Sequence, residues 1–338
     1  MSKPLATFFV SHGSPRMLVD PCPTTEFYAK IGEYARKEGI QGIVWMASHW
    51  ETPLDTIEVA CNPKPDKDFV AFVPPETLQW YRDYQINASP KLSENVCNKL
   101  KDAGFNASLN PTAIWHQDVM IPMRWMYPDY RECPPMAVMS VNGRFDPWFH
   151  LKVGLTLRSL RAEKILLIGS GGGIHNLYTV SWHRIMFYHD TATRTKPIDP
   201  ELAAFAASMR ESVNRNSGPQ LGNALGRLLQ HPHFLKSNPF VVPFMNRMQG
   251  ADVLHRTPEH FLPMVYAAGA CSTWDDSKYV NAFGGENWEM DTQLNANFVF
   301  GLDENDTIFL RSSERDEKSS EGSYAEAPAV PRLVAAAA

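Results

Sequence analysis

The sequence predicts a single α/β domain built on a mostly parallel sheet with helices on both faces. Two observations lead to this prediction. Short apolar runs alternate with longer amphipathic segments through most of the chain. The short runs are also apolar at consecutive positions, which is typical of strands buried on both faces. Strands that alternate with helices in this way usually form a parallel sheet covered on both sides. We expect the domain to occupy residues 1–301.

Four apolar runs are expected to be strands. Each is short, and each ends in polar or turn-forming residues, as a buried strand does when it reaches the edge of a sheet. These strands cover residues 6–13 (ATFFVSHG), 42–50 (GIVWMASHW), 134–142 (PPMAVMSVN) and 164–171 (KILLIGSG).

Amphipathic segments between and after these strands are expected to be helices. Gly39 closes the first of them in the manner of a helix C-terminus. Ser89 is an N-cap for the second, and Pro90 fits its first helical position. The expected helices lie at residues 25–39, 89–105 and 148–163, within 197–235, and in a segment that begins at Thr257.

The end of the chain differs in composition from the rest. Residues 302–338 are charged at first and then rich in small residues, ending in four alanines. Such a segment contains too little apolar surface to offset the entropy of ordering it. We expect it to be a disordered tail.

Overall composition excludes several classes of protein. The net charge of −5 without a basic stripe argues against nucleic-acid binding. No apolar run approaches the length of a membrane span, and the N-terminal run lacks the features of a signal peptide. The five cysteines show no CxxC spacing, so neither a disulfide framework nor a cysteine zinc site is expected. A reducing, cytoplasmic location is expected.

Three histidines follow apolar strands directly. His12 ends FFVSH, His49 ends IVWMASH, and His175 ends LLIGSGGGIH. In an open parallel sheet, ligands bind in the crevice beyond the carboxyl ends of the strands. Imidazole nitrogens that converge there would suit iron, zinc or copper. A single histidine of this kind is more often a hydrogen-bonded turn or core residue, but three at equivalent positions favour a metal site.

A fourth candidate, His260, lies in the segment HRTPEHFLP. Thr257 can cap a helix there and Pro258 fits its first position, so His260 is expected in the first turn. The positive end of the helix dipole lowers the pKa of a histidine at this place, which keeps the imidazole neutral and able to bind a metal. Glu259 is the competing ligand.

The glycine run at 169–173 does not match a nucleotide-binding motif. A dinucleotide fingerprint requires G-x-G-x-x-G, and Ile174 interrupts the pattern here. Because glycine lets a backbone pass close to other groups, we expect the run to bring His175 into the crevice.

Taken together, these motifs resemble the DOPA 4,5-dioxygenase family, within the type III extradiol dioxygenases that are similar to the protocatechuate 4,5-dioxygenase β-subunit. Their order and spacing match the family over nearly all of residues 5–301. The segments that carry the resemblance are FFVSHGSP at 8–15, ASHWET at 47–52, IPMRWMYPD at 121–129, IGSGGGIHNL at 168–177 and TPEHFLPMVYAAGA at 257–270.

The resemblance implies an enzyme that opens the ring of a small, DOPA-like catechol with O2. His12, His49 and His260 would hold one Fe(II) or Zn(II) ion per chain. His175 would act as an acid and base or as an additional ligand. A set of three histidines differs from the 2-His-1-carboxylate triad that is usual in non-haem iron oxygenases.

One segment departs from the family pattern. Where the family has D-H-G-x-W/F-V-P, this chain has WHQDVMIP, and the glycine is absent. His116 lies one residue further from the proline than the family spacing, so either His116 or Gln117 takes the family histidine's role in substrate binding or proton transfer. We favour His116. Trp50, next to His49, is a candidate for contacting an aromatic substrate.

Two other functions remain compatible with these residues. A zinc-dependent hydrolase could use the same histidines to activate water. A non-catalytic binding protein could keep the fold, although it would typically lose metal ligands. The oligomeric state stays open, with a homodimer as one alternative.

Overall fold

A computed structural model describes residues 3–177, 180, 182–194, 196–234, 239–240, 255–256 and 258–310. The strands are β1 (Thr7–Ser11), β2 (Gly42–Thr52), β3 (Thr56–Ala60), β4 (Asn106–Asn110), β5 (Met136–Asn142), β6 (Ile165–Gly171), β7 (Ile174–His175), β8 (Pro239–Phe240), β9 (His255–Arg256), β10 (Val280–Glu289) and β11 (Gln293–Leu302). The helices are α1 (Pro23–Glu38), α2 (Pro75–Asp83), α3 (Pro90–Asp102), α4 (Gln117–Met126), α5 (Pro147–Leu157), α6 (Trp182–Tyr188), α7 (Pro200–Asn214), α8 (Pro219–Arg227) and α11 (Leu262–Gly269).

One large sheet organises these elements, in the strand order β10-β11-β1-β6-β2-β5-β3-β4. The four strands that the sequence predicts form its centre, and β1, β6, β2 and β5 are mutually parallel. Antiparallel pairing occurs where β11 meets β1 and β10, and where β3 meets β5. The predicted fold class, a mostly parallel sheet between helices, is confirmed.

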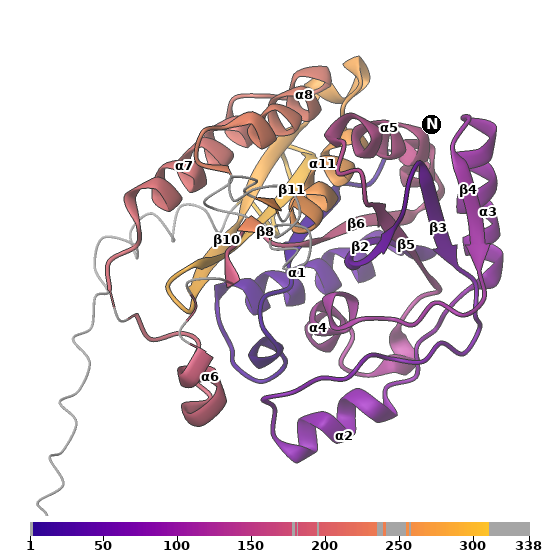
Figure 1. Cartoon of the computed structure of the whole chain (residues 1–338). Helices are drawn as coiled ribbons and strands as arrows, with labels where there is room; N and C mark the ends of the chain where they lie inside the picture. Colours follow the sequence, from indigo (N-terminus) through magenta and orange to yellow (C-terminus); the bar gives the residue numbers. More distant parts are fainter. Residues whose placement is uncertain are drawn as a thin grey trace, which may run out of the picture.

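Helices cover both faces of the sheet (Figure 1). Alternate residues of each central strand point to opposite faces, so Val44 and Met46 join one core while Ile43 and Trp45 join the other. On the first face α5 and α11 pack together over β6, and on the second α1 packs against α4. Because both faces are buried, the site has to lie at an end of the strands.

Several parts of the chain differ from the sequence prediction. The strands β3, β4, β10 and β11 were not anticipated. The ordered domain also extends past residue 301, since Phe309 is buried among Phe8, Phe27 and Tyr34. The predicted tail boundary at residue 302 is therefore too early; the remainder of that segment, residues 311–338, lies outside the described residues. No helix in the described part of the chain is long and apolar enough to cross a membrane.

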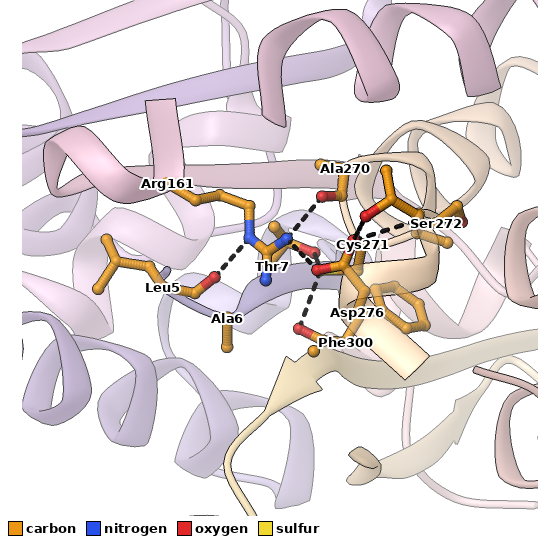
Figure 2. A network of polar contacts seen from close by, with 12 residues as sticks. Leu5, Ala6, Thr7, Arg161, Ala270, Cys271, Ser272, Asp276 and Phe300 are labelled. Atoms are coloured by element: carbon orange, nitrogen blue, oxygen red, sulfur yellow. Dashed lines mark hydrogen bonds and ion pairs between the residues drawn. The ribbon is translucent and has the colours of Figure 1, made fainter. Parts of the chain in front are cut away.

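A buried ion pair joins the start of β1 to the end of α11 (Figure 2). The Arg161 guanidinium donates to the backbone oxygens of Leu5 and Ala270 at 2.6 and 2.7 Å, and to the Asp276 carboxylate at 2.7 Å. Both charged side chains are almost completely buried. This network fixes β1 relative to α11, the helix that follows His260.

Removing the Asp276 charge should destabilise the protein strongly. In an Asp276→Asn variant the buried Arg161 cation loses its counter-charge, so we expect the free energy of unfolding to fall by about 3–5 kcal/mol. Denaturant unfolding measures this change. The control is Glu38→Gln, which breaks the partly exposed pair with Lys164 and should cost less than about 1 kcal/mol. Equal losses of unfolding free energy in the two variants would contradict the role of Asp276 as the counter-charge of Arg161.

Candidate metal centre

Two of the predicted site histidines lie at the carboxyl ends of two parallel strands that flank a third. His12 follows β1, and its backbone N–H donates to the oxygen of Gly171 at the end of β6. His49 lies near the end of β2, where the pairing with β5 becomes irregular between Ala47 and Glu51. Since β6 runs between β1 and β2, the side chains of both histidines reach the same crevice.

The third histidine, His260, is held by a close backbone contact with the glycines of β6. It ends a 3-10 turn, Pro258–His260, which precedes α11. The Gly172 N–H donates to the His260 oxygen at 2.9 Å. A Cβ on Gly171 would lie 1.9 Å from that oxygen, and one on Gly169 would lie 2.0 Å from the oxygen of Pro263. The glycine run thus lets the His260 segment lie directly against the sheet.

This placement corrects the prediction for residues 257–260. His260 is in a 3-10 turn rather than in the first turn of an α-helix. The α-helix that follows, α11, begins at Leu262, and Pro263 lies in its first turn. The expected cap, Thr257, lies outside the described residues.

The rings of His12, His49 and His260 lie close together at steep angles to one another. The centres of the His12 and His49 rings are 4.7 Å apart, and each is 5.2 Å from the centre of the His260 ring. One nitrogen from each ring lies within 4.8 Å of the others, a spacing that would let the three hold a single ion. The geometry brings together the three ligands that the resemblance implies.

Hydrogen bonding leaves one nitrogen of His260 available for a metal. Its Nδ1 lies 3.0 Å from Oε1 of Glu259, whereas its Nε2 is buried and has no hydrogen-bond partner among the described residues. Metal-binding histidines commonly donate their second nitrogen to a carboxylate in this way. The Nδ1 of His12 similarly lies 3.4 Å from the hydroxyl of Ser170. Three imidazoles with this arrangement fit a divalent iron or zinc ion.

Burial keeps the imidazoles of His12 and His260 neutral. It lowers the pKa of His12 well below the usual value, and the nearby rings of His49, His260 and His175 lower it further. Burial, together with His49, also lowers the pKa of His260. The helix dipole, which the sequence suggested as the cause, is therefore not the dominant effect. Neutral imidazoles can bind a metal without first losing a proton.

His175 and Glu259 lie beside the three-histidine cluster. The His175 ring stacks on the His260 ring with centres 3.7 Å apart and planes 10° apart. Burial raises the pKa of the Glu259 carboxyl to about 7. Burial and the proximity of Glu259 also raise that of Glu51 to about 7. In this geometry Glu259 supports His260, and it forms a second potential metal-binding group with His175 and His260.

A cavity of about 560 Å³ opens above the cluster. This volume is in the range of small-molecule sites. His12, His49, His175 and His260 all line it, and Gln117 does too.

The other predicted substrate contacts lie differently. His116 is not among the lining residues; its Nδ1 is 3.4 Å from Oδ2 of Asp68, and this hydrogen bond raises the pKa of His116. Trp50 packs against the core on the α1 side of the sheet and does not line the cavity.

Asp118, which the sequence motifs did not single out, supports the backbone of His49 and the side chain of Ser170. Asp118 is fully buried, and its carboxylate accepts a hydrogen bond from the backbone N–H of His49 at 2.9 Å. Its backbone oxygen accepts from Ser170, the residue next to the His12 ring. In the sequence, only its position in the segment WHQDVM, next to Gln117, could have marked Asp118 as a residue of the site.

Comparison with known families gives a match over residues 6–301 to the catalytic LigB subunit of aromatic ring-opening dioxygenase. The match covers most of the chain. The chain belongs to this family. The resemblance stated from the sequence motifs is thereby confirmed, and membership supports a ring-cleaving dioxygenase as the general activity.

Individual relatives show modest similarity to this chain. A protein named 4,5-DOPA dioxygenase extradiol from Escherichia coli K12 is 27% identical over 80% of this chain and 86% of its own length. Dioxygenase tasH from Hapsidospora irregularis is 30% identical over 68% of this chain and 64% of its own. The fold matches the crystal structure of uncharacterized protein JW3007 from Escherichia coli K12, with a TM-score of 0.63 and 24% identity, over 88% and 99% of the two chains.

A methyl group at Gly171 should disrupt the centre. In Gly171→Ala the new Cβ collides with the His260 backbone, so His260 has to move and the affinity for Zn(II) should fall at least about tenfold. Competition with a chelating dye measures this affinity. Gly172→Ala is the matched control, because its Cβ would make only ordinary contacts at 3.7 Å or more. Normal affinity in Gly171→Ala would contradict the role of this contact.

Glu259 should orient His260 for metal binding rather than bind the metal itself. We expect Glu259→Ala to weaken Zn(II) binding roughly 10- to 100-fold, the usual effect of losing the carboxylate that orients a ligating histidine. His260→Ala should abolish stoichiometric binding. If the two variants lose the metal equally, Glu259 is itself a ligand.

Proposed function

We propose that this protein is a metal-dependent extradiol dioxygenase that cleaves the ring of a catechol with O2. The observation that supports it most is the convergence of His12, His49 and His260 at the floor of a ligand-sized cavity, in a member of the LigB family. Fe(II) is the proposed metal, with one ion per chain.

An Fe(II) ion held by the three imidazoles would supply Lewis acidity toward the catechol oxygens and a redox centre at which the catechol and O2 meet. The chain's own contribution is position. Asp118 fixes the backbone of His49, Glu259 orients His260, and Ser170 contacts the ring of His12. Holding both reactants in one geometry removes much of the entropic cost of their meeting.

His175 is proposed to move protons. Burial lowers its pKa well below the usual value, and the rings of His260 and His49 lower it further. The imidazole is therefore neutral at pH 7 and can accept a catechol hydroxyl proton, then return it as the ring opens. Both atoms of O2 enter the product, and the ring supplies all the electrons, so no further reductant is needed.

Gln117 is proposed to contact the substrate from the position next to His116. It lines the cavity, and its Oε1 is buried without a hydrogen-bond partner in the part of the chain that the structure describes. Such an atom is an acceptor for a substrate hydroxyl. His116 is held by Asp68 instead, and its predicted catalytic role is not adopted in this proposal.

Loading the metal-free protein with Fe(II) under anaerobic conditions, then adding a catechol and oxygen, tests the function. We expect oxygen uptake and a yellow ring-opened product. His175→Ala should reduce kcat by about 10²- to 10⁴-fold, because general acid-base catalysis contributes about that much. Its iron content should stay unchanged, since His175 lies outside the three-histidine cluster.

Two outcomes would contradict this proposal. Failure of every catechol in a broad panel to consume oxygen would exclude the dioxygenase. Oxygen-independent activity that persists with Zn(II) and without iron would favour a hydrolase.

A further inference from the structure

The cavity is polar at its floor and apolar at its rim. The floor carries the buried side chains of His12, Glu259 and His260. Beside the polar residues Ser14, Gln117 and Gln293, large apolar side chains line the cavity: Phe69, Phe72, Leu177, Trp182, Ile185 and Met290. Three of these reach solvent, with exposed fractions of 79% for Phe69, 44% for Trp182 and 37% for Leu177. A catechol whose hydroxyls face the floor would therefore direct its substituent toward apolar side chains.

No lysine or arginine is among the described residues that line this cavity. The cations closest in sequence to lining residues are already paired. Arg16 forms a bidentate ion pair with Asp20, and Arg184 is buried against Asp190 and Asp291. A carboxylate on the substrate would lose its hydration at the rim without gaining a counter-charge from the described lining residues, which is unfavourable.

The acidic side chain of this lining offers no attraction to an anionic substituent. Glu259 lines the floor, where it supplies no positive charge. Glu259 is engaged with His260, at the end of the cavity where the hydroxyls would bind.

From these observations we propose that the substrate is a catechol with an uncharged, apolar substituent, rather than an amino acid or another carboxylated catechol. This inference rests on the proposed function, because it assigns the catechol hydroxyls to the histidine floor. The apolar rim binds the substituent through the hydrophobic effect. Each methylene buried there should lower Kd about three- to fourfold, until the chain extends past the rim.

Binding to the Zn(II)-loaded protein without oxygen tests the inference separately from turnover. Titration calorimetry would compare 4-propylcatechol with 3-(3,4-dihydroxyphenyl)propionate, dopamine and DOPA. We expect the Kd of 4-propylcatechol to be at least about tenfold lower than that of the three charged compounds. A series from 4-ethyl- to 4-butylcatechol should show the dependence on chain length.

Placing a cation at the rim should shift this preference. Phe69 is largely exposed, so Phe69→Arg should fold normally. It should lower the Kd of the carboxylated catechol up to about fivefold, as expected for an exposed ion pair. Phe69→Gln is the matched control, since it removes the ring without adding charge and should give no such gain.

The outcomes separate the two proposals. If a charged catechol binds as tightly as 4-propylcatechol, and Fe(II)-loaded protein turns both over equally, the inference on substrate class is wrong and the dioxygenase stands. If no catechol supports oxygen uptake but 4-propylcatechol still binds at least tenfold more tightly than the three charged compounds, the proposed activity is wrong. The preference of the cavity for an apolar substituent is then upheld.

Discussion

The close contact between the glycines of β6 and the His260 segment is the constraint on which the site depends. Parallel strands bring His12 and His49 to one edge of the sheet, but His260 comes from a separate segment that has to lie against the backbone of β6. Only residues without a Cβ at positions 169 and 171 allow this approach. The hydrogen bond from Gly172 to the His260 oxygen then fixes the depth of the segment. The glycine run therefore serves His260 as much as His175.

The site also places several titratable groups together without any fixed positive charge among them. Burial favours the neutral forms of His12, His260 and Glu259, and neighbouring imidazoles add to this effect for His12 and His260. This floor could hold a cation, because a neutral imidazole has one nitrogen without a proton and Nε2 of His260 is buried without a partner among the described residues. The support comes from Asp118 and Glu259, which hold the histidines by backbone and ring contacts.

Much of this arrangement could be predicted from sequence, for identifiable reasons. The central strands are continuous apolar runs, so their ends, and hence His12 and His49, could be placed. The strand β11 gave no such signal, because Asn295 and Asn297 interrupt its apolar run although both are buried. Hydrogen bonds allow the polar side chain of Asn297 to be buried, because it accepts from the Ser11 N–H and donates to Thr24. The cavity rim could not be predicted either, since its side chains come from loops and from α6, which meet only in the folded chain.

The position of β1 has a consequence for biosynthesis. This strand is translated before every other strand of the sheet, yet it lies between β6 and β11, which are translated much later. Ser14, just after His12, is held by the Glu289 carboxylate from 275 residues further along the chain. Such long-range pairing makes folding slow and leaves an apolar strand without partners during synthesis. A nascent chain that stalls before the β10–β11 hairpin therefore lacks both the strand that pairs with β1 and the carboxylate that holds Ser14.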